Sequence, residues 1–385
     1  MESEAFDLKD WQKFISILLG FCCILGLLAG CSQKEALPEE NRLAYSLSSS
    51  VVENSPVETH TYDLSFLLQE NQMILDCCWV DTNRLLCLTA SQNNEAAEEN
   101  LPSEIRLYML YKGDSTLELI YQGEQFGNQL QKLPQDKVAI LSAYSITVFD
   151  YNRNQIVNEL EINNDEESGN HLALSPNGSQ IVYGDENGMI HLVDEKNETI
   201  GQLEPRDLGY NFLSNPIWSK DGNYIACFCG YEPYSYDDIA IAPVDELDNA
   251  QALNYEASED FYPVWPDQGD HLLVLHNFYN NPDNLPRSLS VLNPDNGNEI
   301  KTIALDNRFN SISLIYADTS TDIYYFVCDQ QLYRQQGGQA AECISPQGLQ
   351  VYSDMVRFLA NGQKCCILAN DTAGNISSLY VLEFD

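Results

Sequence analysis

The sequence predicts an all-β fold, namely one seven-bladed β-propeller of four-stranded antiparallel blades. Three observations support this prediction. A unit of strand, tight turn and second strand recurs along the 385 residues, and its copies are spaced at the length of one blade. The segments between turns alternate with a period of two residues, as in Ser145–Phe149 and Met189–Val193, so no helical repeat fits.

The repeat is clearest in three segments, Leu172–Tyr183, Asn215–Cys227 and Tyr262–Val274. Asn177-Gly178 and Asp221-Gly222 stand in the turns of the first two, because these dipeptides tolerate the positive φ that a short hairpin requires. The segments resemble the WD40-like repeats of TolB-type periplasmic propellers, with their Pro-x-Trp-Ser-x-Asp-Gly core. The resemblance implies the fold and no particular ligand.

Four weaker copies follow the same order of strand and turn. Together with the clear copies they give seven anchors, at residues 79, 133, 174, 218, 265, 315 and 358, which are 41 to 54 residues apart. The last repeat supplies only three strands before the sequence ends at Asp385. We expect Thr61–Leu67 to be its fourth strand, which would close the ring between the two ends of the chain.

Residues 1–30 are predicted to be a signal peptide. The apolar run Phe14–Gly30 is short for a membrane span and suits the hydrophobic region of a signal. It ends in Leu28, Ala29 and Gly30, and with Cys31 these residues resemble the lipobox of bacterial lipoproteins. The resemblance implies cleavage before Cys31 and acylation of the Cys31 thiol. An uncleaved signal anchor is the alternative interpretation.

The predicted domains follow from this start. Residues 31–59 are expected to be the lipidated cysteine and a flexible tether, because Ser32–Thr59 is polar, contains Pro38 and Pro56, and shows little periodicity. Residues 60–385 are the predicted propeller. Two or three acyl chains hold a protein firmly on a membrane, so we expect a cell-membrane location with the propeller facing away from the cytoplasm.

The formal net charge of −39 argues against nucleic acid as a partner, because the long-range field repels a polyanion. Of the 12 cysteines, three belong to the signal and the lipid site. The other nine are expected to be buried thiols that pack as small apolar residues. In the adjacent pair Cys365-Cys366, as in Cys77-Cys78, neighbouring side chains on a strand point to opposite faces, so a bridge within a pair would be strained.

Motifs of catalysis are lacking in the sequence. The five histidines form no zinc-binding pattern, and there is no nucleophile elbow or phosphate-binding glycine loop. Asp295–Glu299 offers oxygen atoms that suit calcium, yet it fits a hairpin turn equally well. We therefore predict no cofactor and no metal.

Topology predicts a binding face. In an up-and-down blade, the connections between second and third strands emerge at one end of the ring together with the links between blades. Three of these connections are long: Ser91–Asn100, Tyr231–Asp238 and Asn277–Pro286. Two of them lie in neighbouring blades and carry aromatic and acidic side chains, and the candidate residues are Tyr231, Tyr234, Tyr236, Asp237, Asp238, Phe278, Tyr279 and Asp283.

Such a face suits a protein, a peptide or a glycan, since tyrosine rings supply contact area at low entropic cost. The sequence therefore favours a membrane-anchored, non-catalytic binding or scaffold propeller. The alternative is an envelope enzyme, active on carbohydrate or peptide, with an acidic site at the central channel. Its candidate carboxylates lie on the links between blades: Asp165, Glu166, Glu204, Asp207, Glu259 and Asp260.

Overall fold

The structure is a computed structural model. It describes residues 43–53, 55–91, 103–125, 127–142, 145–162, 172–232, 236–253, 261–276, 287–306, 312–370 and 375–384. The chain divides into two compact units, Met1–Glu35 and Ala36–Asp385. The first unit, with the predicted signal, Leu28, Ala29, Gly30 and Cys31, lies outside the described residues.

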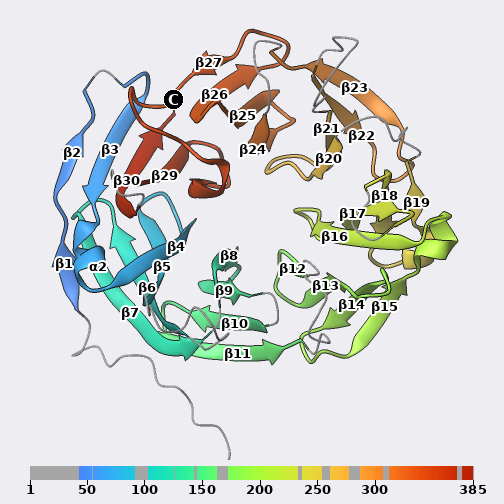
Figure 1. The fold of residues 1–385 in the computed structure, drawn as a ribbon, viewed down its shortest axis with the longest axis horizontal. Helices are drawn as coiled ribbons and strands as arrows, with labels where there is room; N and C mark the ends of the chain where they lie inside the picture. Colours follow the sequence, from blue (N-terminus) through green and yellow to red (C-terminus); the bar gives the residue numbers. More distant parts are fainter. Residues whose placement is uncertain are drawn as a thin grey trace, which may run out of the picture. The chain divides into compact units, whose positions relative to one another are not determined.

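The second unit confirms the predicted seven-bladed propeller, since seven antiparallel sheets follow one another around a ring (Figure 1). Blade 1 consists of β4 (Gln72–Trp79), β5 (Arg84–Ser91), β6 (Ser103–Tyr111) and β7 (Thr116–Gln125). Blade 2 consists of β8 (Gln129–Leu133), β9 (Lys137–Leu141), β10 (Ser145–Asp150) and β11 (Gln155–Glu161). Blade 3 consists of β12 (Leu172–Leu174), β13 (Gln180–Gly184), β14 (Ile190–Asp194) and β15 (Thr199–Leu203).

Blade 4 consists of β16 (Phe212–Trp218), β17 (Tyr224–Gly230), β18 (Asp238–Pro243) and β19 (Gln251–Ala252). Blade 5 consists of β20 (Phe261–Val264), β21 (Leu272–His276), β22 (Ser288–Leu292) and β23 (Glu299–Ala304). Blade 6 consists of β24 (Ser313–Asp318), β25 (Ile323–Cys328), β26 (Gln331–Gln336) and β27 (Glu342–Cys343). In each blade the strands pair in sequence order, with the first strand towards the centre of the ring (Figure 1).

Blade 7 combines strands from near both ends of the described chain. It consists of β28 (Val356–Phe358), β29 (Lys364–Asn370) and β30 (Ile376–Glu383), and β3 (Glu58–Asp63) pairs with β30 as its fourth strand. The predicted ring closure is therefore confirmed, but the strand lies earlier than Thr61–Leu67. The short helix α2 (Ser65–Gln69) follows it, because Leu64 and Leu67 are both fully buried and stand three residues apart, which is a helical spacing.

The predicted tether 31–59 is wrong for the part that the structure describes. Strand β1 (Ala44–Ser46) adds a fifth strand to blade 1 by pairing with β7, and β2 (Ser49–Val51) adds a fifth strand to blade 7 by pairing with β3. Both lie at the outer edge of a sheet and are almost wholly exposed. A polar segment can pair there because an outer edge strand needs few apolar side chains. In β1 only Tyr45 packs inward, with its ring 4.6 Å from that of Phe66.

The predicted hairpin turns are confirmed in the clear repeats. Gly178 and Gly222 have φ of 76° and 77°. In the turn of blade 4, Asp221 Oδ1 accepts hydrogen bonds from the Ser219 hydroxyl at 2.6 Å and from the Asn223 amide at 3.0 Å. The repeated Ser-x-Asp-Gly sequence is thus a self-contained turn that fixes the register of the first two strands.

The repeated tryptophan joins one blade to the blade before it. Trp218 Nε1 of blade 4 donates to the Ala173 carbonyl of blade 3 at 3.0 Å, and Trp79 Nε1 of blade 1 donates to the Arg357 carbonyl of blade 7 at 3.0 Å. Trp265 Nε1 is buried without a hydrogen-bond partner among the described residues. The tryptophan therefore combines apolar packing with a specific bond between blades in two of its three copies.

Trp218 makes a hydrogen bond between blades and Trp265 makes none with the described residues, so replacing each of them by Phe gives two variants that can be compared. Trp218→Phe should lower the free energy of unfolding by about 1 kcal/mol beyond the loss of ring area, because it removes a buried hydrogen bond and leaves the Ala173 carbonyl unsatisfied. Trp265→Phe removes a similar area without such a bond. Urea unfolding of the two variants measures the difference, and equal losses would show that the Trp218 bond adds nothing.

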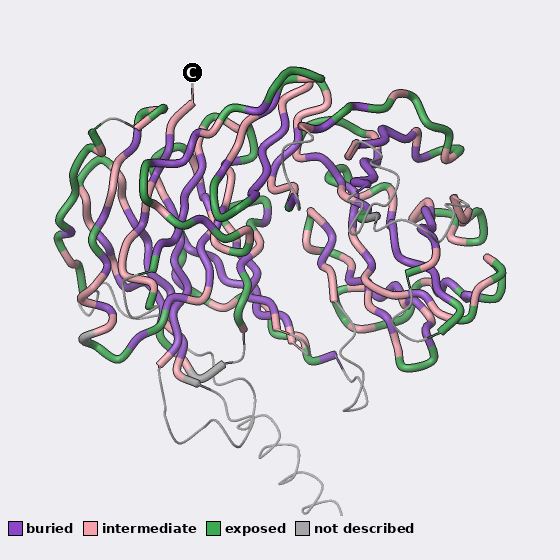
Figure 2. Tube along the Cα trace, turned by 45° about the horizontal axis from the view of Figure 1, so that its top comes forward, coloured by how far each residue is buried: buried purple, intermediate pink, exposed green. Residues whose placement is uncertain are grey.

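The apolar core lies between adjacent blades. Buried residues are concentrated in the middle strands of the blades, whereas exposed residues follow the outer strands and turns (Figure 2). Of the nine cysteines in the described part, seven are buried, whereas Cys78 and Cys343 are half-buried. Eight of the nine belong to or pack against hydrophobic clusters, as predicted. Cys343 does not, since its Sγ lies 3.4 Å from Gln331 Oε1 and 3.5 Å from Ser345 Oγ. Within the same ranges, every helix is too short or too polar to cross a bilayer.

Candidate functional site

The propeller has two chemically different ends. We call the end that carries the turns between first and second strands and between third and fourth strands the hairpin face. The opposite end, which carries the connections between second and third strands and the links between blades, is called the loop face. Because all blades share one strand order, each face collects equivalent connections from every blade.

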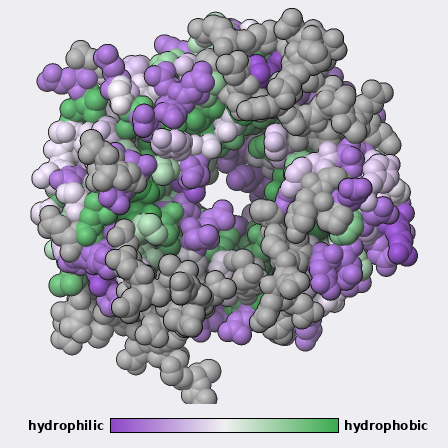
Figure 3. All heavy atoms as spheres, viewed as in Figure 1, coloured by the Kyte–Doolittle hydropathy of each residue, from purple (hydrophilic) through white to green (hydrophobic). Residues whose placement is uncertain are grey.

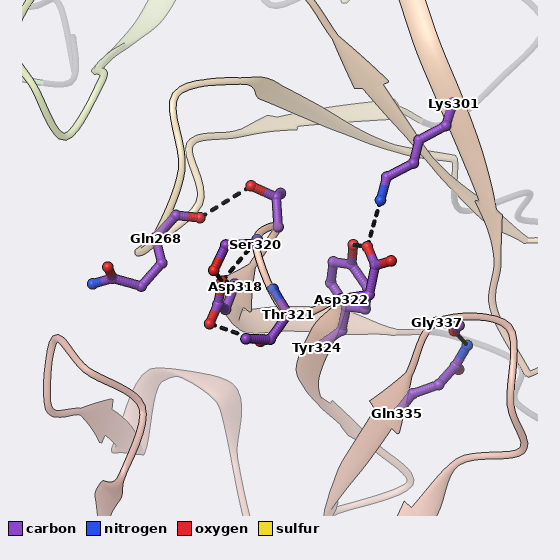
Figure 4. A network of polar contacts seen from close by, with 10 residues as sticks. Gln268, Lys301, Asp318, Ser320, Thr321, Asp322, Tyr324, Gln335 and Gly337 are labelled. Atoms are coloured by element: carbon purple, nitrogen blue, oxygen red, sulfur yellow. Dashed lines mark hydrogen bonds and ion pairs between the residues drawn. The ribbon is translucent and has the colours of Figure 1, made fainter.

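On the hairpin face, polar side chains make contacts within and between blades. Asp318 accepts hydrogen bonds from the Ser320 and Thr321 hydroxyls at 2.5 and 2.7 Å (Figure 4). Between blades 5 and 6, Thr319 Oγ1 donates to the Gln268 carbonyl at 3.1 Å, and Lys301 pairs with Asp322 (Figure 4). These groups connect blades 5 and 6 and stabilise the fold.

The loop face carries three well-exposed tyrosines from two neighbouring blades. Tyr231 and Tyr236, in the connection between β17 and β18, are 57% and 45% exposed, and Tyr262 of β20 is 47% exposed. Two further rings support them, Tyr210 and Phe228. We call these five residues the aromatic face.

Contacts with neighbouring aromatic rings hold the exposed tyrosines in place. The Tyr231 ring lies 5.0 Å from that of Tyr210, and the Tyr236 ring lies 4.5 Å from that of Phe228. The edge of Phe228 also approaches Tyr262, at 6.4 Å between centroids. Each tyrosine of the loop therefore rests on a second ring, so the exposed rings enter a binding event already ordered.

Two asparagines lie beside the exposed rings. Asn211 Nδ2 donates to the Tyr231 carbonyl at 2.8 Å, and Asn215 Nδ2 donates to the Tyr236 hydroxyl at 3.2 Å. The Asn211 side chain is exposed and that of Asn215 is half-buried. Their amide oxygens can accept hydrogen bonds from a ligand, so the aromatic face offers flat apolar surface together with polar groups at its margin.

The predicted binding residues have different outcomes. Tyr231 and Tyr236 are exposed as predicted, and Asp237 is half-buried, where it accepts the Tyr231 amide at 2.9 Å. Asp238 is fully buried and cannot touch a ligand, so its assignment is wrong. It begins β18, a middle strand that is covered on both sides. Tyr234, Phe278, Tyr279 and Asp283 lie outside the described residues.

Asp238 instead stabilises the aromatic face through a hydrogen bond with Tyr210. It accepts a hydrogen bond from the Tyr210 hydroxyl at 2.8 Å, and burial and the Asp238 carboxylate together raise the pKa of Tyr210. The sequence analysis did not identify Tyr210, Asn211, Asn215 or Tyr262. Tyr210 and Asn211 lie in the link before β16, and Tyr262 lies near the start of β20, so their positions on the loop face could have been predicted. Asn215 is the middle residue of β16, and only tertiary packing brings it to Tyr236.

The proposed acidic site at the channel receives little support from the described residues. Glu204 and Asp207 are exposed on the link that contains the 3₁₀ helix η3 (Pro205–Leu208), and Asp165, Glu166, Glu259 and Asp260 lie outside the described residues. The ring is open at its centre, with hydrophilic side chains at the rim (Figure 3). Of the six carboxylates, only Glu204 and Asp207 belong to the described residues, and both are exposed on one link rather than facing each other across the channel.

One buried carboxylate does stand on an innermost strand. Asp76 is 1% exposed and forms an ion pair with Arg357 of blade 7 at 2.8 Å, while its other oxygen accepts the amide of Leu130 of blade 2 at 2.7 Å. Burial raises the pKa of Asp76, and Arg357 and the backbone donors oppose that shift. Asp76 therefore joins three consecutive blades, which is a structural role.

Neither of the possible metal positions in the described part is a convincing site. Glu58, His60 and Glu383 come within ligand distance of one another, but Lys364 at 3.2 Å and Lys112 both pair with Glu383 and would repel a cation. At the predicted calcium alternative, Asp295–Glu299, the carboxylate of Glu299 accepts the Ser290 and Thr302 hydroxyls at 2.6 and 2.7 Å. That segment is a hairpin turn.

Comparison with known proteins gives the fold and nothing finer. No family model and no curated protein matches the chain. Among solved structures it is similar to an oligogalacturonate lyase from Vibrio parahaemolyticus, with a TM-score of 0.60 and 12% identity over 89% of this chain and 98% of that one. It is also similar to an oligogalacturonate lyase in complex with manganese, with a TM-score of 0.58, 13% identity and the same coverage. At this identity the likeness establishes that the chain has a propeller fold.

Proposed function

We propose that this protein is a lipid-anchored, extracytoplasmic propeller that binds a neutral oligosaccharide on its aromatic face, without catalysing a reaction. The observation that carries the proposal is the group of exposed, ring-supported tyrosines with side-chain amides beside them. The anchor rests on the resemblance of Leu28, Ala29, Gly30 and Cys31 to a lipobox.

A sugar ring matches the chemistry of this face. Its C–H groups present an apolar surface that packs flat on a tyrosine ring, and its hydroxyls exchange hydrogen bonds with amides and carboxylates. Tyr231, Tyr236 and Tyr262 supply the rings, while Asn211 and Asn215 supply the amides. Because each ring already contacts another ring, little side-chain entropy is lost on binding.

The charge of the protein selects among sugars. The net charge is −39, and Glu204, Asp207 and Glu232 are exposed on the loop face. An acidic oligosaccharide would be repelled by this field, whereas a neutral one would not. We therefore infer a ligand class that differs from oligogalacturonate, the sugar for which the two similar lyases are named.

A panel of immobilised glycans tests the proposal. Purified residues 43–385 should bind one or more neutral oligosaccharides, with little change in affinity between low and high salt, because no ion pair is involved. Tyr231→Ala combined with Tyr236→Ala should reduce binding at least tenfold, which corresponds to about 1.4 kcal/mol. The outer-strand residues Ile200 and Ile300 are 50% and 52% exposed, so their change to Ala is the matched control.

The same panel can contradict the proposal. If only acidic glycans bind, or if the outer-strand variant loses as much binding as the tyrosine variant, the aromatic face is not a site for neutral sugar. Thermal unfolding of both variants should match that of the natural chain, because the changed side chains are exposed.

A further inference from the structure

The seam between blade 1 and blade 7 brings two thiols together. Cys77 of β4 and Cys366 of β29 are 289 residues apart in the chain, yet their Sγ atoms are 3.3 Å apart. Both residues are fully buried. This seam is where the two ends of the propeller meet, so a covalent bond here would close the ring.

We propose that Cys77 and Cys366 form a disulfide that joins the first blade to the last when the chain folds in an oxidising compartment. The inference rests on the proposed extracytoplasmic location, because disulfides persist outside the cytoplasm and are rare within it. A disulfide requires a sulfur separation of about 2.05 Å, so the two Sγ atoms must approach by about 1.3 Å. Strands β4 and β29, which carry the two cysteines, contribute to the same hydrophobic cluster between blades 1 and 7.

The surrounding seam holds the two strands in position for this bond. Trp79 Nε1 donates to the Arg357 carbonyl at 3.0 Å, and Arg357 pairs with Asp76 at 2.8 Å. Both contacts lie beside the two thiols, since Asp76 precedes Cys77 and Arg357 faces Cys366 across the β28–β29 pair. We therefore expect the two strands to keep their pairing while the sulfur atoms approach each other.

The bond would form while the ring closes. One thiol, as its thiolate, attacks the disulfide of an envelope thiol oxidoreductase and gives a mixed disulfide; the second thiolate then displaces the oxidoreductase, which leaves as a dithiol. Two protons and two electrons are lost from the protein. After closure the reaction is slow, because the contact with Cys366 and burial raise the pKa of Cys77, and burial raises the pKa of Cys366.

Cys87 provides the matched control. It lies opposite Cys77 in the β4–β5 pair and is also fully buried, so it is the competing partner for Cys77 within blade 1. Cys87→Ala should leave the seam disulfide intact, whereas Cys77→Ala and Cys366→Ala should each abolish it.

Peptide mapping of the full chain tests the proposal. Cells that export the chain are quenched in acid, and the denatured protein is alkylated without reductant. We expect a linked peptide that contains Cys77 and Cys366, with Cys87 alkylated. Reduction should lower the Tm of the natural chain by about 5 °C or more and leave the Tm of Cys77→Ala unchanged.

Two outcomes overturn the proposal. If Cys77 and Cys366 are alkylated both in protein from cells and in protein refolded with oxidised glutathione, the seam does not form the bond. If the bond forms only on refolding with glutathione, the disulfide is absent from the natural protein. Metabolic labelling of Cys31 with palmitate, lost in Cys31→Ser, reports export separately and shows whether the proposed location failed as well.

Discussion

Replacing Arg357 with Met should lower the free energy of unfolding by about 3–5 kcal/mol, because it leaves the Asp76 carboxylate buried without its partner charge. Asp76 is 1% exposed and joins the innermost strands of blades 7, 1 and 2. The Arg357 side chain also donates to the Asp354 and Val356 carbonyls at 2.8 and 2.9 Å, so its loss affects the local backbone as well.

Arg84→Met is the control for this variant. Arg84 pairs with Asp81 at 2.7 Å, but both side chains are partly exposed and belong to one turn of blade 1. An ion pair of that kind contributes about 1 kcal/mol or less. Denaturant unfolding measures both variants. The double variant Asp76→Asn with Arg357→Met should recover part of the loss, and a loss at Arg357 no larger than that at Arg84 would show that the seam ion pair is unimportant.

A chain that begins at Ser65 should fail to form a soluble monomer, whereas a chain that begins at Leu43 should fold with an unchanged Tm. The shorter chain lacks β3 and therefore leaves β30 as an open edge next to apolar side chains. It also loses Thr59 and Tyr62, which are 0% and 2% exposed. Size-exclusion chromatography and thermal unfolding measure this difference.

Supplying β3 as a separate peptide tests whether the absence of this strand causes the failure to fold. A peptide of residues 43–64 should restore a soluble monomer to the chain that begins at Ser65. The same peptide with Tyr62→Asp should not, because the tyrosine ring is buried in the seam. A soluble monomer with the natural Tm in the absence of peptide would contradict the proposed closure.

The fold could be predicted because hairpin turns leave a local signature. Gly178 and Gly222 adopt positive φ where the repeat places them, and their spacing gives the blades. Strands β1 and β2 could not be predicted in the same way. They are three residues long and lie at outer edges, where only Tyr45 packs on the core, so their sequences carry no alternation of apolar and polar residues.

The candidate site was harder to predict, since it depends on which side chains two blades bring together. The loop that carries Tyr231 and Tyr236 was identified from its length and composition. Burial of Asp238 was not, because five of the six residues of β18 are buried and a period of two is absent there. The contact of Tyr236 with Phe228, and the approach of Phe228 to Tyr262 of the next blade, follow from tertiary packing alone.

The central claim is that the anchored protein binds a neutral oligosaccharide on its aromatic face. The most direct test measures how much of a fluorescently labelled neutral oligosaccharide living cells capture. Cells with the natural chain should carry the glycan on their surface. Cys31→Ser should move glycan binding to the medium, and Tyr231→Ala with Tyr236→Ala should leave an anchored protein that captures at least tenfold less glycan. Undiminished capture by the anchored tyrosine variant would contradict the account and direct the search for the site to the central channel.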